Sequence, residues 1–434
     1  INEKNVRGNH QLKISVTDYQ GKVMEVGTYE TEAAGGEVYG QLLVKDVKIP
    51  VPTAGGLCRI EAKLCKENSV VTTGYDDILS VNLASNMLDG KGAVWEDGSA
   101  LQNFLKGKTK EAVAAYEDNL GKLDWIMVAR PPRKDQLTMV PMEALRSADG
   151  KPGLDVVYYE DMEFQKEVYH EVAKVVNLSA IEGATPSPFV YMLDGYGIKW
   201  SGKVLPSVSG EYTIIPQSND RSMIEVFVNG KKIYEITRKK EHLGDGKVYL
   251  EGGKSADIEI RFRHPRSNAR CRLDWAVPND KMPDAQRLME RAVNDGTKIF
   301  IIQSADEWSE FIAANSKVVF KDKFFVGTNW LGGVMFNKPH DIFKELPVGN
   351  ALNWPYQALI HTGVERMGLV MEGEELLVGA YHTYPMAIGT AMGIVPMGKG
   401  SVLFSTLDIY GNIINDSAAG LVAKKLIFNM IDFK

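Results

Sequence analysis

The sequence predicts a multi-domain chain: an all-β sandwich, then a doubly wound α/β domain that is interrupted by a second, inserted all-β sandwich. The chain has 434 residues, which is too long for one ordinary core. Short alternating runs fill residues 11–82, and helical patterns with buried strands begin after Gly92. Strand patterns return between Gly153 and Val277.

The composition is that of a folded protein, and it excludes two classes of partner. The 50 basic and 56 acidic residues give a net charge of -6, and no long run of Lys or Arg is present. We therefore expect no nucleic-acid partner. No apolar stretch reaches the roughly 20 residues that a bilayer span requires, so we expect no membrane span. The first four residues hold neither an initiator Met nor the parts of a signal peptide, which predicts a fragment of a longer protein.

Residues 1–85 are predicted to form the first sandwich. Runs at residues 12–16 and 58–64 alternate between apolar and polar side chains, and turn clusters separate them at residues 19–21 and 53–56. This stretch resembles the immunoglobulin-like sandwich that accompanies the barrel of glycoside hydrolase family 2 enzymes. The resemblance implies that the parent protein is a large glycosidase.

The α/β domain is predicted to be split, covering residues 86–150 and 280–434. Its expected helices and buried strands follow one another as in a doubly wound sheet. The helices are expected at residues 100–105, 110–120, 284–294 and 417–430, and the strands at residues 124–129, 298–302 and 401–405. These pieces resemble the flavodoxin-like, glutamine-amidotransferase-like domain found near the C-terminus of several large β-glycosidases.

The inserted segment, residues 151–279, has the most specific pattern. Ile198, Trp200, Tyr212 and Ile214 alternate with polar neighbours, as inward-facing strand residues do. The Asn229-Gly230 pair predicts a hairpin turn. The pieces at residues 196–202, 209–214, 218–222 and 224–233 resemble the protective-antigen-type (PA14) β-sandwich, which is also inserted in glycosidases and present on yeast adhesins.

The resemblance implies a site for sugar. In sugar-binding relatives, two adjacent aspartates in the loop before the hairpin hold a calcium ion that grips sugar hydroxyls. The matching residues are Asn219 and Asp220, and an amide in place of one carboxylate weakens a calcium site. We therefore expect no metal and no other cofactor, with calcium at Asp220 as the alternative. The candidate carbohydrate-binding residues are Asn219, Asp220, Arg221 and Asn229; the alternative is that they hold their own turns.

We expect no catalytic residues in this chain. Glycoside hydrolysis needs two carboxyl groups on a suitable barrel, and no eightfold strand-helix alternation is present. An amidotransferase needs a Cys on a strand-to-helix elbow, whereas Cys58, Cys65 and Cys271 all fall in the predicted sandwiches. The α/β fold is therefore expected to be a scaffold.

Two further groups of residues could serve either structure or binding. The histidines, including His340, His361 and His382, are too dispersed for a metal motif. Aromatic and amide side chains could stack on sugars or pack between domains, and they comprise Asn329, Trp330, Asn350, Asn353, Trp354 and Tyr356.

Together these features predict the non-catalytic accessory region of a secreted, retaining glycoside hydrolase. It would bind an oligosaccharide or polysaccharide and position it for a catalytic barrel elsewhere in the parent chain. The resemblance implies export to the periplasm or beyond. The alternatives are a purely structural or dimerisation module that binds no sugar, and a free-standing enzyme of unknown chemistry.

Overall fold

The computed structural model describes most of the chain, in two compact units. The units are Ile1–Ser85 with His340–Val348, and Asn86–Pro339 with Gly349–Lys434. The described residues are 6–35, 40–52, 55–83, 87–133, 137–180, 185–187, 190, 195–218, 221–266, 269–278, 282–326, 333–349, 351–360, 367–383 and 386–433. Within these ranges, no helix is long and apolar enough to cross a membrane.

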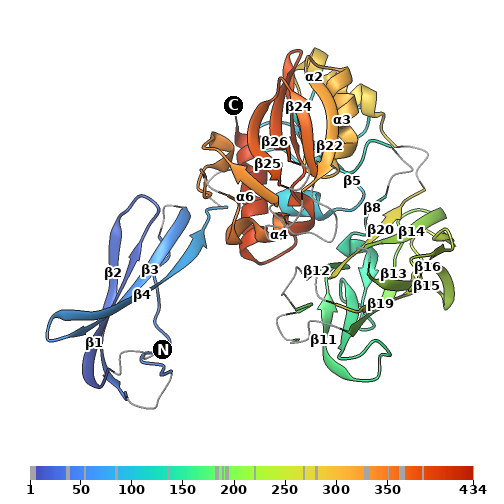
Figure 1. The fold of residues 1–434 in the computed structure, drawn as a ribbon. Coiled ribbons are helices and arrows are strands. Elements are labelled where there is room, and N and C mark those ends of the chain that lie inside the picture. Colours follow the sequence, from blue (N-terminus) through green and yellow to red (C-terminus); the bar gives the residue numbers. More distant parts are fainter. Residues whose placement is uncertain are drawn as a thin grey trace. The chain divides into compact units, whose positions relative to one another are not determined.

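The first unit is built on one antiparallel sheet with the order β2-β1-β3-β4. The strands are β1 (Gly8–Thr17), β2 (Val23–Ala33), β3 (Gly56–Lys66) and β4 (Ser69–Ser80) (Figure 1). Val16 and Cys58 are buried on this sheet, and Ile342 and Phe343 are buried in the segment that joins the unit from later in the chain. The strands agree with the predicted alternation, but the described residues form one sheet, whereas a sandwich needs two. The immunoglobulin-like fold stays a prediction.

The α/β part of the second unit contains a mixed sheet with ten described strands. Its parallel strands have the order β6-β5-β7-β21-β27, and β26, β24 and β22 continue the sheet antiparallel. Strands β23 and β25 form a side branch that pairs with β26. The strands are β5 (Gly92–Glu96), β6 (Ala114–Ala115), β7 (Trp125–Ala129), β21 (Lys298–Ile301), β22 (Val319–Phe325), β23 (Gly333–Asn337), β24 (Met367–Glu372), β25 (Glu375–His382), β26 (Ala387–Met397) and β27 (Gly400–Ser405).

Helices cover both sides of this sheet. Helices α2 and α3 pack one face, where Leu288 and Trp308 contact the core, and α6 lies on the other side (Figure 1). The helices are α1 (Ala100–Leu105), α2 (Ala285–Asp295), α3 (Ala305–Ala314), α4 (Gln357–Ile360), α5 (Ile409–Asn412) and α6 (Ala418–Asp432). The predicted helices at 100–105, 284–294 and 417–430 and the predicted strands at 124–129, 298–302 and 401–405 are confirmed.

The predicted helix at residues 110–120 is wrong. This segment contains β6, which pairs in parallel with β5. Tyr116 is buried there and packs against Trp95, with their ring centroids 5.7 Å apart. The segment has good helix formers, but tertiary contacts override a propensity of a few tenths of a kcal/mol per residue.

The inserted part is a β-sandwich, as predicted. Its larger sheet has the order β11-β10-β13-β19-β15-β16-β17 with β9 beside β13, and its smaller sheet has the order β12-β20-β14-β18 with β8 beside β20. The strands are β8 (Thr138–Met139), β9 (Leu145–Arg146), β10 (Leu154–Tyr159), β11 (Glu167–Ala173), β12 (Asn177–Ala180), β13 (Tyr196–Val204), β14 (Gly210–Ser218), β15 (Met223–Val228), β16 (Lys231–Ile236), β17 (His242–Leu243), β18 (Lys247–Leu250), β19 (Ala256–His264) and β20 (Ala269–Ala276).

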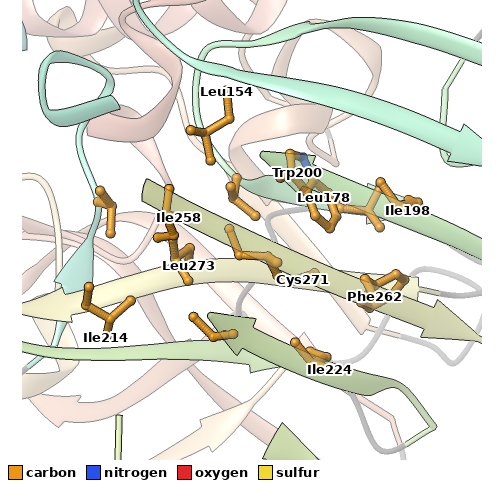
Figure 2. Close-up of a cluster of buried hydrophobic side chains, with 14 of the residues drawn as sticks. Leu154, Leu178, Ile198, Trp200, Ile214, Ile224, Ile258, Phe262, Cys271 and Leu273 are labelled. Carbon is orange, nitrogen blue, oxygen red and sulfur yellow. The ribbon is translucent and has the colours of Figure 1, made fainter. Parts of the chain in front are cut away.

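The core of this sandwich lies between its two sheets. Ile198, Trp200, Tyr212 and Ile214 are all buried, so their predicted inward direction is confirmed. Figure 2 shows Cys271 among these apolar side chains. Strands β8 and β9 pair with the sandwich sheets, so residues ahead of position 151 also contribute to it.

Candidate functional site

Several loops of the sandwich come together at one of its ends, and the candidate residue Arg221 lies in one of them. Antiparallel pairing places Tyr159 opposite Gly197, and Met223 opposite Arg263. Strands β10, β19 and β16 therefore finish at the end where β13 and β15 begin. We call the described residues of the connecting loops the loop end, and they are residues 160–166, 221–222, 237–241 and 265–266.

The structure separates the four predicted sugar-binding residues. Arg221 is exposed in a turn at the loop end, and Asn219 and Asp220 lie outside the described residues. Asn229 follows β15 at its other end, eight positions along the chain from Arg221. At about 3.3 Å per strand residue, this is a separation of roughly 26 Å. Arg221 and Asn229 therefore do not share one site.

Asn229 closes the β15–β16 hairpin. Its backbone has φ of 48°, and Gly230 follows with φ of 75°, as a tight hairpin turn requires. The Asn229 N–H donates to the Asp257 carbonyl at 2.8 Å, and the Asn229 Oδ1 accepts from the Asp257 N–H at 2.9 Å. The side chain thus ties the hairpin to β19.

A buried polar pair next to Arg221 joins the loop before β15 to the last residue of β19. The Ser222 Oγ lies 3.1 Å from the His264 Nδ1, and these residues are only 4% and 0% exposed. The His264 ring also stacks on Phe262, with an interplanar angle of 6°. The pair holds the start of β15 against the end of β19. Sequence reasoning missed both residues, although the inward alternation that includes Phe262 indicates a buried His264.

The β10–β11 hairpin forms a second fixed loop at the loop end. The Asp161 carboxylate accepts hydrogen bonds from the N–H groups of Glu163, Gln165 and Lys166. Desolvation acts to raise the pKa of Asp161, but these hydrogen bonds outweigh it and hold the pKa below its ordinary value. The loop therefore keeps its shape through its own carboxylate.

Apart from the loop end, a cluster of carboxylates lies where the parallel strands of the α/β sheet end. Ligands of α/β proteins bind at such an edge. The Glu96 carboxylate accepts from the N–H groups of Leu101 and Gln102, both at 3.0 Å, and from the Tyr410 hydroxyl at 2.8 Å. Burial raises the pKa of Glu96, although these hydrogen bonds act to lower it. The neighbouring Asp97 accepts from Arg130 and from the Thr138 hydroxyl.

Side chains of the sandwich meet the same edge. Arg272 forms a bidentate ion pair with Asp274, with both contacts at 2.6 Å. The positive charge of Arg272 also acts to lower the pKa of Asp408. Burial raises the pKa of Asp408, which accepts hydrogen bonds from the Gly411 N–H and the Asn177 side chain. These acids are held by partners within the chain, which is the arrangement of a structural network.

The remaining candidates are spread over the fold. Cys271 is buried in β20, and burial raises the pKa of its thiol, while Cys58 and Cys65 are buried in the first unit. Tyr356 is 1% exposed and its hydroxyl accepts from Asn337, whereas Trp354 is 42% exposed. Asn329, Trp330, Asn350 and His361 lie outside the described residues.

Two histidines lie at different places in the fold. The His382 Nδ1 lies 2.9 Å from the Phe325 carbonyl, and the His340 Nδ1 accepts from the Ile342 N–H. In the part of the chain that the structure describes, no group of three or more His, Cys, Asp or Glu residues is arranged to hold a metal ion.

Comparison with known proteins identifies the inserted sandwich. Residues 150–287 match the family described as PA14 domain. This part of the chain is a PA14 domain. The anti-sigma-I factor RsgI3 of Acetivibrio thermocellus is 28% identical over 127 residues, which are 29% of this chain and 19% of that protein. The chain thus covers about a fifth of the length of this relative.

Two solved structures are similar to parts of this chain, one over about half of it and one over about a quarter. A β-glucosidase from Kluyveromyces marxianus is 12% identical with a TM-score of 0.35, over 51% of this chain and 29% of that chain. A structure described as the PA14 sugar-binding domain from an RTX adhesin is 14% identical with a TM-score of 0.24, over 28% of this chain and 88% of that chain.

Proposed function

We propose that this chain is the non-catalytic accessory region of a secreted glycoside hydrolase, and that its PA14 domain binds an oligosaccharide or polysaccharide. The PA14 match over residues 150–287 is the observation that carries the proposal. The sugar would be positioned for a catalytic barrel elsewhere in the parent chain, a retaining enzyme similar to glycoside hydrolase family 2, and the protein would work in the periplasm or outside the cell.

The proposed sugar contacts are Asn219, Asp220 and Arg221. Amide, carboxylate and guanidinium groups pair well with the vicinal hydroxyls of a sugar. The Ser222–His264 pair supports this assignment because it fixes the residue that follows these three. Asn229 would act on the hairpin and not on the same sugar, since it lies at the other end of β15.

The α/β domain would serve as a scaffold of the flavodoxin-like, amidotransferase-like type. If its parallel strands β5, β6, β7, β21 and β27 are numbered 1 to 5 along the chain, their order across the sheet is 2-1-3-4-5, as in flavodoxin-like folds. The acids at the ends of these strands are engaged with Tyr410, Arg130 and Arg272. This supports a structural role for the edge.

Isothermal titration calorimetry of the chain against a panel of oligosaccharides tests the proposal. We expect saturable binding that Asp220→Ala weakens by about ten-fold or more, which is the order of one lost hydrogen bond to a charged group. Titrations with and without calcium show whether Asp220 acts through an ion. Asp149→Ala is the control, because Asp149 is an exposed carboxylate in a different turn. No heat from any glycan would refute the proposal and favour a structural or dimerisation module.

A further inference from the structure

Three of the four loops at the loop end carry a positive patch, although the chain as a whole has a net charge of -6. The fourth loop, residues 160–166, holds Glu160, Asp161 and Glu163 with Lys166 and is not part of the patch. The three loops of the patch, residues 221–222, 237–241 and 265–266, contain five exposed cations and one carboxylate among their described residues. The cations are Arg221, Arg238, Lys239, Lys240 and Arg266, and the carboxylate is Glu241.

These three loops are neighbours in the fold. Strands β19, β15 and β16 are adjacent in the larger sheet, and the loops leave them at the same end. The Ser222–His264 contact continues the register of β15 with β19 by one pair. Arg221 and Arg266 are therefore held on adjoining loops, one position from direct opposition.

The third loop is a closed turn. The Thr237 N–H donates to the Glu241 carbonyl at 3.0 Å, and the Lys240 N–H donates to the Thr237 carbonyl at 2.9 Å. The turn presents Arg238, Lys239 and Lys240 to solvent, since all three side chains are exposed.

The patch cations differ from two arginines on the neighbouring strand β19 in how they are paired. On the outer face of the sheet, Arg263 pairs with Glu225 at 2.8 Å and Arg261 pairs with Glu259 at 2.6 Å. Among the described residues, no ion pair within 4.0 Å involves the patch cations Arg221, Arg238, Lys239 or Arg266. Their charge is available to a ligand.

We infer that the PA14 domain selects acidic glycans, with the carboxylates of uronic acid residues bound by Arg221, Arg266 and the Arg238–Lys240 turn. The inference rests on the proposed sugar-binding function and names its ligand class. Guanidinium groups match a planar carboxylate with two parallel hydrogen bonds. The patch has a few cations on three short loops, and this arrangement matches the carboxylates spaced along an acidic oligosaccharide. Nucleic acid carries one charge per roughly 1.7 Å and needs a longer basic stripe.

A matched pair of ligands tests this inference. Calorimetry would compare tetragalacturonate with its fully methyl-esterified, uncharged form on the full chain. We expect the charged form to bind at least about ten-fold more tightly, the order of one charge-assisted hydrogen bond. The preference should shrink as salt rises from about 50 to about 300 mM, because exposed charges are screened.

Two double variants separate the patch from overall charge. Arg238→Ser with Arg266→Ser should remove the preference and leave binding of the uncharged form unchanged, since neither residue is among the proposed contacts to sugar hydroxyls. Lys203→Ser with Lys231→Ser is the matched control: these exposed lysines lie at the opposite end of the sandwich, and the change in charge is the same. The control should keep the preference, and circular dichroism should show both variants folded.

The outcomes distinguish this inference from the proposed function. Equal affinity for the two forms, or equal loss of both in the Arg238/Arg266 variant, overturns the acidic-glycan assignment and leaves sugar binding intact. If the chain binds neither form and no other glycan, both the acidic-glycan inference and the proposed function are refuted. Tighter binding to single-stranded DNA or to anionic vesicles, with the same sensitivity to the Arg variants, would assign the patch to another ligand and overturn the inference.

Discussion

Gly197 determines how the β10–β11 hairpin packs on the sheet at the loop end. It lies on β13 between Tyr159 and Arg263, and the Phe164 ring covers the space that a side chain would fill. The Phe164 ring meets Tyr159 edge-on at 5.3 Å, and the Arg263 guanidinium lies 4.6 Å from its centroid. Phe164 itself has φ of 60°, an unusual value for a side chain of this size.

Gly197→Ala should therefore destabilise the chain. A Cβ at this position would lie 2.7 Å from the Phe164 ring and 2.9 Å from the Asp161 carbonyl oxygen. We expect the free energy of unfolding to fall by about 1 to 3 kcal/mol, as in other overpacked sites. Chemical denaturation measures the change.

Gly74→Ala is the control for this substitution. Gly74 is an exposed strand residue in β4, and beyond Gly74 and its two chain neighbours no atom lies within 4 Å of an added Cβ. It should change the free energy of unfolding by less than about 0.5 kcal/mol. Equal effects of the two alanines would show that Gly197 is not needed for the ring contact.

The segment around Tyr116 shows what decides structure at the scale of an element. Arg291 of α2 holds it: its guanidinium donates to the Tyr116 hydroxyl and to the carbonyls of Asp118, Leu120 and Gly121. These bonds reach across about 170 residues of sequence. No local pattern in the segment predicts them.

Arg291→Leu should loosen this segment. Loss of the four hydrogen bonds should lower the free energy of unfolding by about 2 kcal/mol, less than their sum because the freed carbonyls can bind water. Hydrogen exchange should rise in peptides that cover residues 112–122.

Arg287→Leu provides the comparison one helical turn earlier. Arg287 lies on the same helix, and its side chain is exposed. We therefore expect Arg287→Leu to change the free energy of unfolding by less than about 0.5 kcal/mol. If Arg291→Leu left both stability and exchange unchanged, the segment would be held by its buried Tyr116 alone.

At the scale of the whole molecule, the two units have separate cores. Val16 is buried in the first unit and Leu288 in the second, both at 0% exposure. Units with their own cores generally unfold as separate cooperative transitions. We therefore expect calorimetry of the chain to resolve two transitions.

Two substitutions test this expectation. Val16→Ala and Leu288→Ala should each leave a cavity and lower the free energy of unfolding by about 1 to 4 kcal/mol. Each should lower the melting temperature of a different transition. A single transition that both variants shift together would mean that the units unfold as one.

The sequence by itself determined the elements whose signals are local. Alternation predicted the inward residues of β13 and β14, including Trp200 and Tyr212. The helix predicted at 284–294 is observed at Ala285–Asp295. The Asp284 carboxylate caps its N-terminus by accepting from the Gln286 N–H, and Gly296 adopts φ of 77° after the last turn. Such signals are local because the hydrogen bonds and burial that produce them span only a few residues.

Only the tertiary structure decided which loops share an end of the sandwich. It separated Asn229 from Arg221, joined Ser222 to His264 across 42 positions, and gathered Arg238 and Arg266 beside Arg221. It also replaced the helix expected at 110–120. Strand register and the contacts of a single Arg depend on partners far away in sequence, so they cannot be deduced from one segment read alone.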